Sequence, residues 1–197
     1  NTVPINTPLA MKGSTSTKIS GNYSKASVEM KRVVARFDID NDASKTALTI
    51  TKLSVQKAHP YATLFDTPVG TGTLQSYAPV DYSTLPNANT GVSTGAAYMH
   101  PSAKANQSLL VIEGFFLNPS TKTDVPVTYR VPIAVNPSTP VAGGTVDYID
   151  VKPNTRYMMR ISEVTEAEIT AIFEIEDWTS GGGVDIKPDN DVNPEVL

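Results

Sequence analysis

The sequence predicts an all-β fold, a sandwich or barrel of roughly seven to nine strands. Apolar residues recur at every second position in several separate runs, which is the period of a half-buried β-strand. Turn-forming residues separate these runs at intervals typical of a sandwich. Only 163–167 has a helix-like composition, and this segment is too short for a stable helix. A length of 197 residues favours one domain.

The first two strong runs, 28–39 and 47–55, each move their apolar residues from one strand face to the other midway. A change of face by one residue is what a β-bulge produces, so we expect one bulge near 31–32 and another within 47–55. Turn residues occupy 41–44. The two runs are therefore predicted to be an antiparallel pair.

The segment 1–27, rich in Ser, Thr, Asn and Gly, predicts a lead-in with at most one edge strand. In 57–107 no period persists, and we expect an irregular insert that includes a short strand at 96–99. Regular alternation returns afterwards. The later predicted strands are 108–117, which is apolar on both faces and therefore central, 127–135, where Pro132 indicates a free edge, 155–162 and 169–176. The sandwich domain is expected to span 28–178, followed by a flexible tail at 179–197. The side chains expected in its shared core include Phe37, Ile50, Val131, Met159 and Phe173.

Composition excludes several classes of function. A net charge of −4, a pI near 5.1 and the lack of any long Lys/Arg cluster argue against nucleic-acid binding. Without cysteine there is no disulfide, thiolate nucleophile or cysteine metal site. No stretch approaches the ~18 apolar residues of a membrane helix. The first residues lack the pattern of a signal peptide, so we expect a mature or processed chain.

The sequence predicts no catalytic, cofactor-binding or metal site. His59 and His100 each precede a proline, which is typical of turns. The alternating Asp38, Asp40 and Asp42 resemble the start of a calcium loop, but the glycine and distal glutamate of such a loop are missing, which favours a solvated strand end.

Other arrangements also favour structural roles. No Gly-x-Ser-x-Gly turn occurs. Glu174 and Glu176 share one face of a predicted strand, where like charges stay in water, and the glycines at 181–183 indicate a flexible joint. We therefore expect no enzyme and no cofactor.

Six segments in order along the chain resemble those of the fimbrillins, the subunits of bacterial type V pili. The segments are RVVARFDI (32–39), YMHPS (98–102), LVIEG (110–114), YRVPI (129–133), PNTRY (153–157) and FEIEDW (173–178). Together they cover 28–178, which corresponds to the second of the two β-sandwich domains of a fimbrillin. None is specific alone, and the resemblance depends on their order.

The resemblance implies a transthyretin-like, Greek-key sandwich, secretion as an outer-membrane lipoprotein, proteolytic trimming, and assembly into filaments for adhesion and biofilm formation. The sequence departs from the family pattern because it lacks the lipidated cysteine, a signal sequence and a full first domain. Any membrane attachment would therefore depend on a lipid anchor that is not in this chain.

Two segments are candidates for recognition. Exposed tyrosines offer rigid amphipathic area for sugar rings or proteins, and the insert carries Tyr61, Phe65, Tyr77 and Tyr82. The alternative is that these aromatic residues fix the insert to the sandwich. In the tail, Val184 and Ile186 alternate like a strand that could pair with a neighbouring subunit, while Pro188 limits its length. A disordered tail is the equal alternative.

These observations predict a non-enzymatic structural or accessory subunit of a cell-surface fimbria, which works by β-strand contacts. Its expected partners are other fimbrial subunits, and further a host or bacterial surface protein or glycan. The alternative function is a carbohydrate- or protein-binding module on the cell surface.

Overall fold

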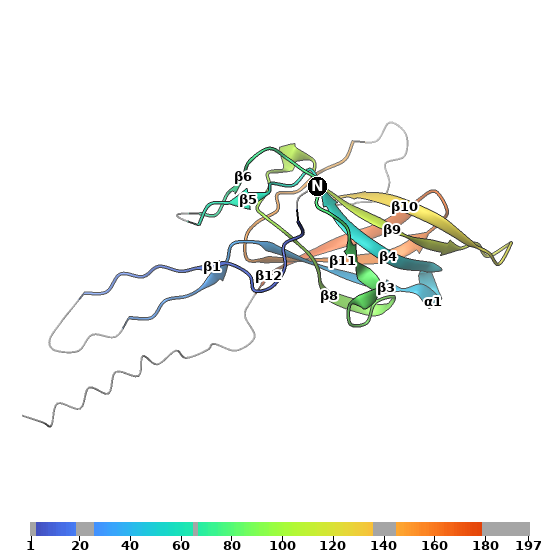
Figure 1. Ribbon diagram of the computed structural model, residues 1–197, viewed down its shortest axis with the longest axis horizontal. Helices are drawn as coiled ribbons and strands as arrows, with labels where there is room; N and C mark the ends of the chain where they lie inside the picture. The colour runs from blue at the N-terminus through green and yellow to red at the C-terminus, as the bar shows by residue number, and fades with distance from the viewer. Residues whose placement is uncertain (1–2, 19–25, 65–66, 136–144, 179–197) are drawn as a thin grey trace, which may run out of the picture.

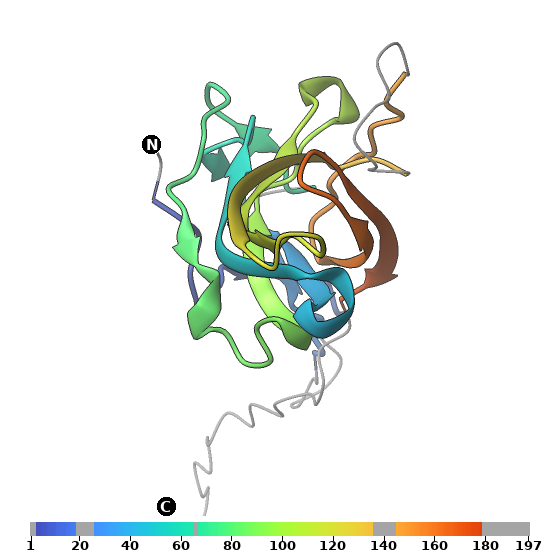
Figure 2. The ribbon, with the colours of Figure 1, turned by 90° about the vertical axis from the view of Figure 1, so that its right-hand side faces the viewer.

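The structure, a computed structural model, describes residues 3–18, 26–64, 67–135 and 145–178. Two four-stranded sheets face each other across one core (Figure 1). Seen from the end that carries α1, the strands surround a common interior (Figure 2). This arrangement confirms the predicted all-β sandwich, and its four and four strands fall within the predicted number.

The first sheet has the order β10-β9-β4-β7 and the second β12-β11-β3-β8. Neighbouring strands are antiparallel, except that β11 and β3 are parallel. In the first sheet the strands are β10 (Asp124–Pro132), β9 (Leu109–Leu117), β4 (Leu48–Gln56) and β7 (Val80–Asp81). In the second they are β12 (Ile169–Asp177), β11 (Thr155–Val164), β3 (Ala35–Asp42) and β8 (Thr90–Met99).

The remaining elements are small. The pair β1 (Met11–Lys12) and β2 (Lys31–Arg32) leads away from the sandwich on the left of Figure 1. The hairpin of β5 (Tyr61–Ala62) and β6 (Gly70–Thr71) lies at the end opposite α1 (Figure 1). The short helices are α1 (Ala43–Thr46) and the 3-10 turns η1 (Tyr82–Thr84) and η2 (Lys104–Asn106).

The core lies between the two sheets, where alternate residues of each strand point inward. Side chains expected in the core are fully buried at Phe37, Ile50, Val131 and Met159. Phe173 is only partly buried, because it lies on the edge strand β12. In the described part of the chain no helix is long and apolar enough to cross a membrane.

The expected antiparallel pair of 28–39 with 47–55 is wrong. The strands β3 and β4 belong to different sheets, and α1 carries the chain from one sheet to the other. Asp42 caps this helix by accepting a hydrogen bond from the Ser44 amide, and Ala47 ends it with a positive φ of 58°. The turn-forming residues at 41–44 therefore begin the short helix α1, through which the chain passes from one sheet to the other.

The first expected bulge is also wrong. The strand is interrupted between β2 and β3, and Val33 and Val34 are both buried there against Trp178. The second bulge is confirmed between Ile50 and Lys52, where the register of β4 with β9 shifts.

The segment 57–107 is less irregular than predicted. The expected strand at 96–99 is the end of β8, which pairs with β3 along most of its length. The expected central position of β9 and the edge position of β10 are both confirmed. Gly114 in β9 allows close approach to β4, because a Cβ there would lie 2.2 Å from the Thr49 carbonyl oxygen.

Candidate functional site: a groove at the open edge of the sandwich

A pocket of about 330 Å³ opens where β7 and β8, the last strands of the two sheets, come together. One wall of the pocket is formed by 53–55 of β4 and the other by 95–98 of β8. The N-terminal residues 4–6 also line the pocket. Its side chains are mostly apolar, including Ile5 and Leu85. Such volume and lining suit an apolar ligand group.

The backbone of β8 gives this pocket a second property. Within the residues that the structure describes, β3 is the one strand paired with β8, so the other edge of β8 is free. The opposing strand β7 is only two residues long. A free strand edge beside an apolar pocket can accept an additional strand, because main-chain hydrogen bonds supply affinity and the pocket takes alternate side chains.

The charge of the pocket is low. Asp81 is the one charged residue among the described residues that line it, and its Oδ1 already accepts hydrogen bonds from the amide and hydroxyl of Ser83. No histidine, lysine or arginine of the described ranges lines it. The pocket therefore suits apolar side chains, while charged side chains of the same segment would have to point away from it.

The β8 wall contains a large bulge. From Phe37 to Ile39 β3 advances by two residues, whereas their partners in β8 run from Ala97 to Ser93, an advance of four. Gly95 lies within the bulge with a φ of +65°, a conformation that glycine adopts readily. Its amide donates a hydrogen bond of 2.7 Å to Oδ1 of Asp38, which is fully buried although it lies on the outer face of β3.

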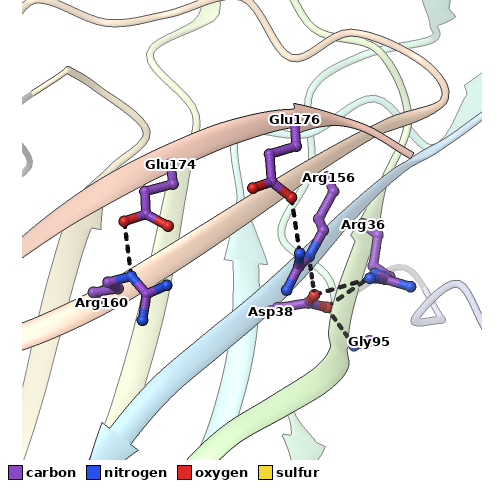
Figure 3. A network of polar contacts seen from close by, with 7 residues as sticks. All are labelled: Arg36, Asp38, Gly95, Arg156, Arg160, Glu174 and Glu176. Atoms are coloured by element: carbon purple, nitrogen blue, oxygen red, sulfur yellow. Dashed lines mark hydrogen bonds and ion pairs between the residues drawn. The ribbon is translucent and has the colours of Figure 1, made fainter. Parts of the chain in front are cut away.

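Asp38 belongs to a chain of ion pairs on the outer face of the second sheet (Figure 3). Arg36 lies 3.0 Å from its carboxylate, and Arg156 Nε lies 2.6 Å from Oδ2. Arg156 also pairs with Glu176. Hydrogen bonding to Asp38 raises the pKa of the Arg156 guanidinium, so this arginine remains charged.

Further along the same face Arg160 pairs with Asp40 and Glu174. The hydrogen bond from Arg160 lowers the pKa of Glu174. The carboxylates considered for calcium or for acid–base chemistry, at 38, 40, 174 and 176, therefore have arginine partners, and Asp42 caps α1.

Trp178 adjoins this network at the edge of the pocket. The guanidinium carbons of Arg32 and Arg36 lie 4.1 and 4.8 Å from the centre of its ring. The ring stacks on Tyr98, with centroids 6.0 Å apart and an interplanar angle of 19°. Tyr98 lines the pocket, so Trp178 supports the pocket wall from outside.

Of the four aromatic residues predicted for recognition, the three that the structure describes do not form a shared exposed surface. Tyr61, on β5, is 68% exposed. Tyr77 and Tyr82 are buried in the core, which corrects their assignment to an exposed platform, because their rings fix the insert to the sandwich. Phe65 lies outside the described residues, as do Val184, Ile186 and the glycines at 181–183.

The two histidines lie in a hydrogen-bonded network beneath the β5–β6 hairpin. His59 Nδ1 donates to the Gly72 carbonyl, and its Nε2 accepts from Asn106. The carbonyl oxygen of His59 accepts from the Tyr77 hydroxyl at 2.6 Å, and His100 Nδ1 lies 3.0 Å from the same oxygen. Burial lowers the pKa of His100. Among the described residues no three His, Asp or Glu side chains gather where they could hold a metal ion.

The sequence did not single out the groove. Its walls come from 53–55, 77–85 and 95–98, which are distant in the chain, and most of these residues are ordinary apolar ones. One signal was present: an isolated glycine within a strand pattern, as at Gly95, indicates a bulge.

Comparisons with known proteins find similarity in structure only. The sequence matches no protein-family model and no curated protein. The fold is similar to that of a candidate cell adhesion protein of Bacteroides uniformis, with a TM-score of 0.57 and 17% identity over 90% of this chain and 65% of that one.

A second similarity, to a candidate cell adhesion protein of Parabacteroides distasonis, has a TM-score of 0.50 and 14% identity over 77% of this chain and 53% of that one. A weaker one, to the C-terminally truncated tip fimbrial protein Mfa3 of Porphyromonas gingivalis, has a TM-score of 0.46 and 16% identity over 76% and 52% of the two chains.

The chain thus spans about half to two thirds of the length of the solved structures it resembles, between 52% and 65% for these three. The fold similarity agrees with the resemblance drawn from the six sequence segments. At identities below a fifth, the comparisons show that this chain has the all-β fold found in candidate cell adhesion proteins of Bacteroides and Parabacteroides.

Proposed function

We propose that this protein is a non-enzymatic cell-surface adhesion subunit of the fimbrial type, which joins neighbouring subunits by adding a β-strand at the groove between β7 and β8. The observation that carries the proposal is the free edge of β8 beside an apolar pocket. A strand placed there would extend the second sheet and bury its alternate side chains between the sheets.

The shared fold supports this proposal, since two of the similar structures are candidate cell adhesion proteins. The proposed location is the outer surface of a bacterial cell, with outer-membrane attachment through a lipid anchor elsewhere in the full protein. Formation of filaments and of biofilm belongs to the same proposal.

As the donated strand we propose 184–187 of the tail. In this sequence Val184 and Ile186 alternate with polar residues, and Pro188, which has no amide hydrogen, limits the pairing to this short segment.

A photo-crosslinking amino acid tests the groove as a subunit contact. It is placed at Leu85, which lines the pocket, or at the exposed Lys122 in the turn between β9 and β10 as the matched control. In cells that make the full-length protein, illumination should give adducts with further subunits from position 85 and few from 122. Equal yields at both positions, or none at 85, would refute the proposal.

The donated strand is tested in the same assay by deleting 180–197. If the tail is the donor, the deletion should abolish the adducts from position 85 without lowering the stability of the isolated protein. Unchanged adduct yield would show that another segment occupies the groove.

A second function, binding of a glycan or protein by the β5–β6 hairpin, is favoured by one observation. Tyr61, Leu64 and Val69 are all at least half exposed there, while the base of the hairpin is fixed by the His59 network. A rigid base reduces the entropy lost on binding. A glycan array would test this function, with Tyr61→Ala expected to remove any binding and Ile172→Ala, an exposed residue of β12, expected to leave it unchanged.

A further inference from the structure

The groove wall and the ion pairs on the outer face of the second sheet are parts of one connected structure. The wall segment Gly95–Tyr98 lines the pocket, and Asp38 contacts it from the opposite side of the sheet through the Gly95 amide (Figure 3). The carboxylate serves as the hydrogen-bond acceptor for an amide inside the bulge, where the regular ladder of β3 and β8 is interrupted.

The contacts form a closed ring that begins and ends at Asp38. Asp38 pairs with Arg36, and Arg36 lies over Trp178. Trp178 stacks on Tyr98, whose hydroxyl oxygen lies only 2.5 Å from where a Cβ of Gly95 would be. The Gly95 amide then returns to Asp38. Two members of the ring, Gly95 and Tyr98, line the pocket.

The burial of Asp38 makes its contacts costly to break. A carboxylate loses hydration when it is buried, so it requires hydrogen bonds and opposite charges in compensation. Asp38 is 0% exposed and has three such partners, namely Arg36, Arg156 and the Gly95 amide. Movement of the bulge would leave this buried charge without one of them.

We propose that Asp38 is a positioning residue for the groove, which holds the wall Gly95–Tyr98 in the shape that receives a strand. This inference rests on the proposed function, and it adds the residue that prepares the site. Because the wall is already held in the free protein, binding does not have to order it.

The variants Asp38→Ala and Asp38→Asn test this role. Alanine removes the acceptor of the Gly95 hydrogen bond, whereas asparagine keeps an oxygen there and loses the charge. Asp40→Asn is the matched control, because Asp40 lies on the same face of β3 and pairs with an arginine, Arg160.

Hydrogen exchange in the full chain, followed by NMR, provides the first measurement. In Asp38→Ala the Gly95 amide should exchange about tenfold faster or more, since a hydrogen bond to a charged acceptor is lost. In Asp38→Asn the increase should be smaller, and in Asp40→Asn the rate should not change. Amides of β9 in the other sheet should be unaffected in all three. Unchanged exchange of the wall amides in Asp38→Ala would overturn the inference, whatever binds in the groove.

Crosslinking from position 85 provides the second measurement, at a temperature where every variant is folded. The yield should fall at least fivefold in Asp38→Ala, recover partly in Asp38→Asn and stay unchanged in Asp40→Asn. Faster wall exchange with an unchanged crosslinking yield would overturn the positioning role. If the unaltered protein gives no adducts, the subunit contact fails, while faster wall exchange still supports the role of Asp38 in shaping the groove.

If Asp38→Ala does not fold, Gly95→Ala alters the wall itself and leaves Asp38 in place. Its Cβ would meet the Tyr98 hydroxyl and would require a positive φ. It should lower the crosslinking yield to a similar extent, and an unaltered yield would overturn the inference.

Discussion

Replacing Phe37 by alanine should destabilise the protein more than most single substitutions. The side chain is fully buried at the centre of the core. It stacks on Tyr157 at 5.1 Å between ring centroids and meets Phe173 edge-on at 6.3 Å. Removal of a buried phenylalanine costs about 3–5 kcal/mol, and each lost aromatic pair adds about 0.5–1.5 kcal/mol beyond the buried area. Partial collapse of the cavity would offset some of this, and we expect a loss of about 4 kcal/mol.

Urea denaturation followed by fluorescence of Trp178, the single tryptophan, measures this loss. For a chain of this size about 4 kcal/mol corresponds to a fall in Tm of roughly 8–16 °C. Ile172→Ala is the control, because Ile172 lies in the same sheet but is 46% exposed, and it should cost less than about 1 kcal/mol. A loss below about 2 kcal/mol for Phe37→Ala, or equal losses for the two variants, would show that the inward face of β3 has been assigned wrongly.

Three further changes test other parts of the structure. Tyr77→Phe removes the hydroxyl that donates to the His59 carbonyl, so unfolding in urea should show a loss of about 1 kcal/mol; unchanged stability would mean that this bond does not anchor the insert. Asn89→Ala leaves the Ile50 amide without its 2.8 Å acceptor and should cost about 1–3 kcal/mol by the same measurement, whereas a neutral result would contradict the bond. Burial lowers the pKa of His100 below 6.5 in the folded protein. As the pH falls, His100 is therefore protonated in the unfolded chain before it is protonated in the folded protein. The stability linked to His100 is complete above about pH 6.5 and declines below it. His100→Gln should therefore lose less stability between about pH 7 and pH 5 than the unaltered protein, and equal losses would refute the assignment.

Alternation of apolar residues predicted most strands and their inward faces, because burial on one side of a sheet imposes a period of two. Phe37, Ile50, Val131 and Met159 were identified as core residues for this reason and are fully buried. The bulge in β4 was visible for the same reason, since the inserted residue shifts the apolar positions by one.

Strand partners could not be predicted in the same way. Turn residues at 41–44 indicate that the chain changes direction, but they do not determine whether the next strand joins the same sheet, and here it joins the other. The parallel pairing of β11 with β3 is not indicated by a local sequence pattern either, because the two strands are far apart in the sequence.

The aromatic residues of the insert show a further limit. Tyr61, Tyr77 and Tyr82 lie in segments without a regular period, so spacing could not separate the exposed Tyr61 from the two buried rings. The groove was missed for a related reason, since a pocket assembled from four separate parts of the chain depends on topology. The sequence alone predicts a solvated strand end at Asp38, because the bulge in β8 that brings the Gly95 amide to it is visible only in the structure.

The parallel pairing of β11 with β3 also determines when the molecule can finish folding. Arg160 and Asp40, which form an ion pair across this junction, are separated by 120 residues. Contacts between such distant segments form late, because the entropy of closing the intervening loop is lost before any contact compensates for it. Until β11 arrives, the second sheet lacks the strand that joins β12 to β3, and Phe37 of β3 lacks Tyr157, the ring on which it stacks. The second sheet of a nascent chain therefore stays incomplete until the residues of β11, from Thr155 onward, have been synthesised.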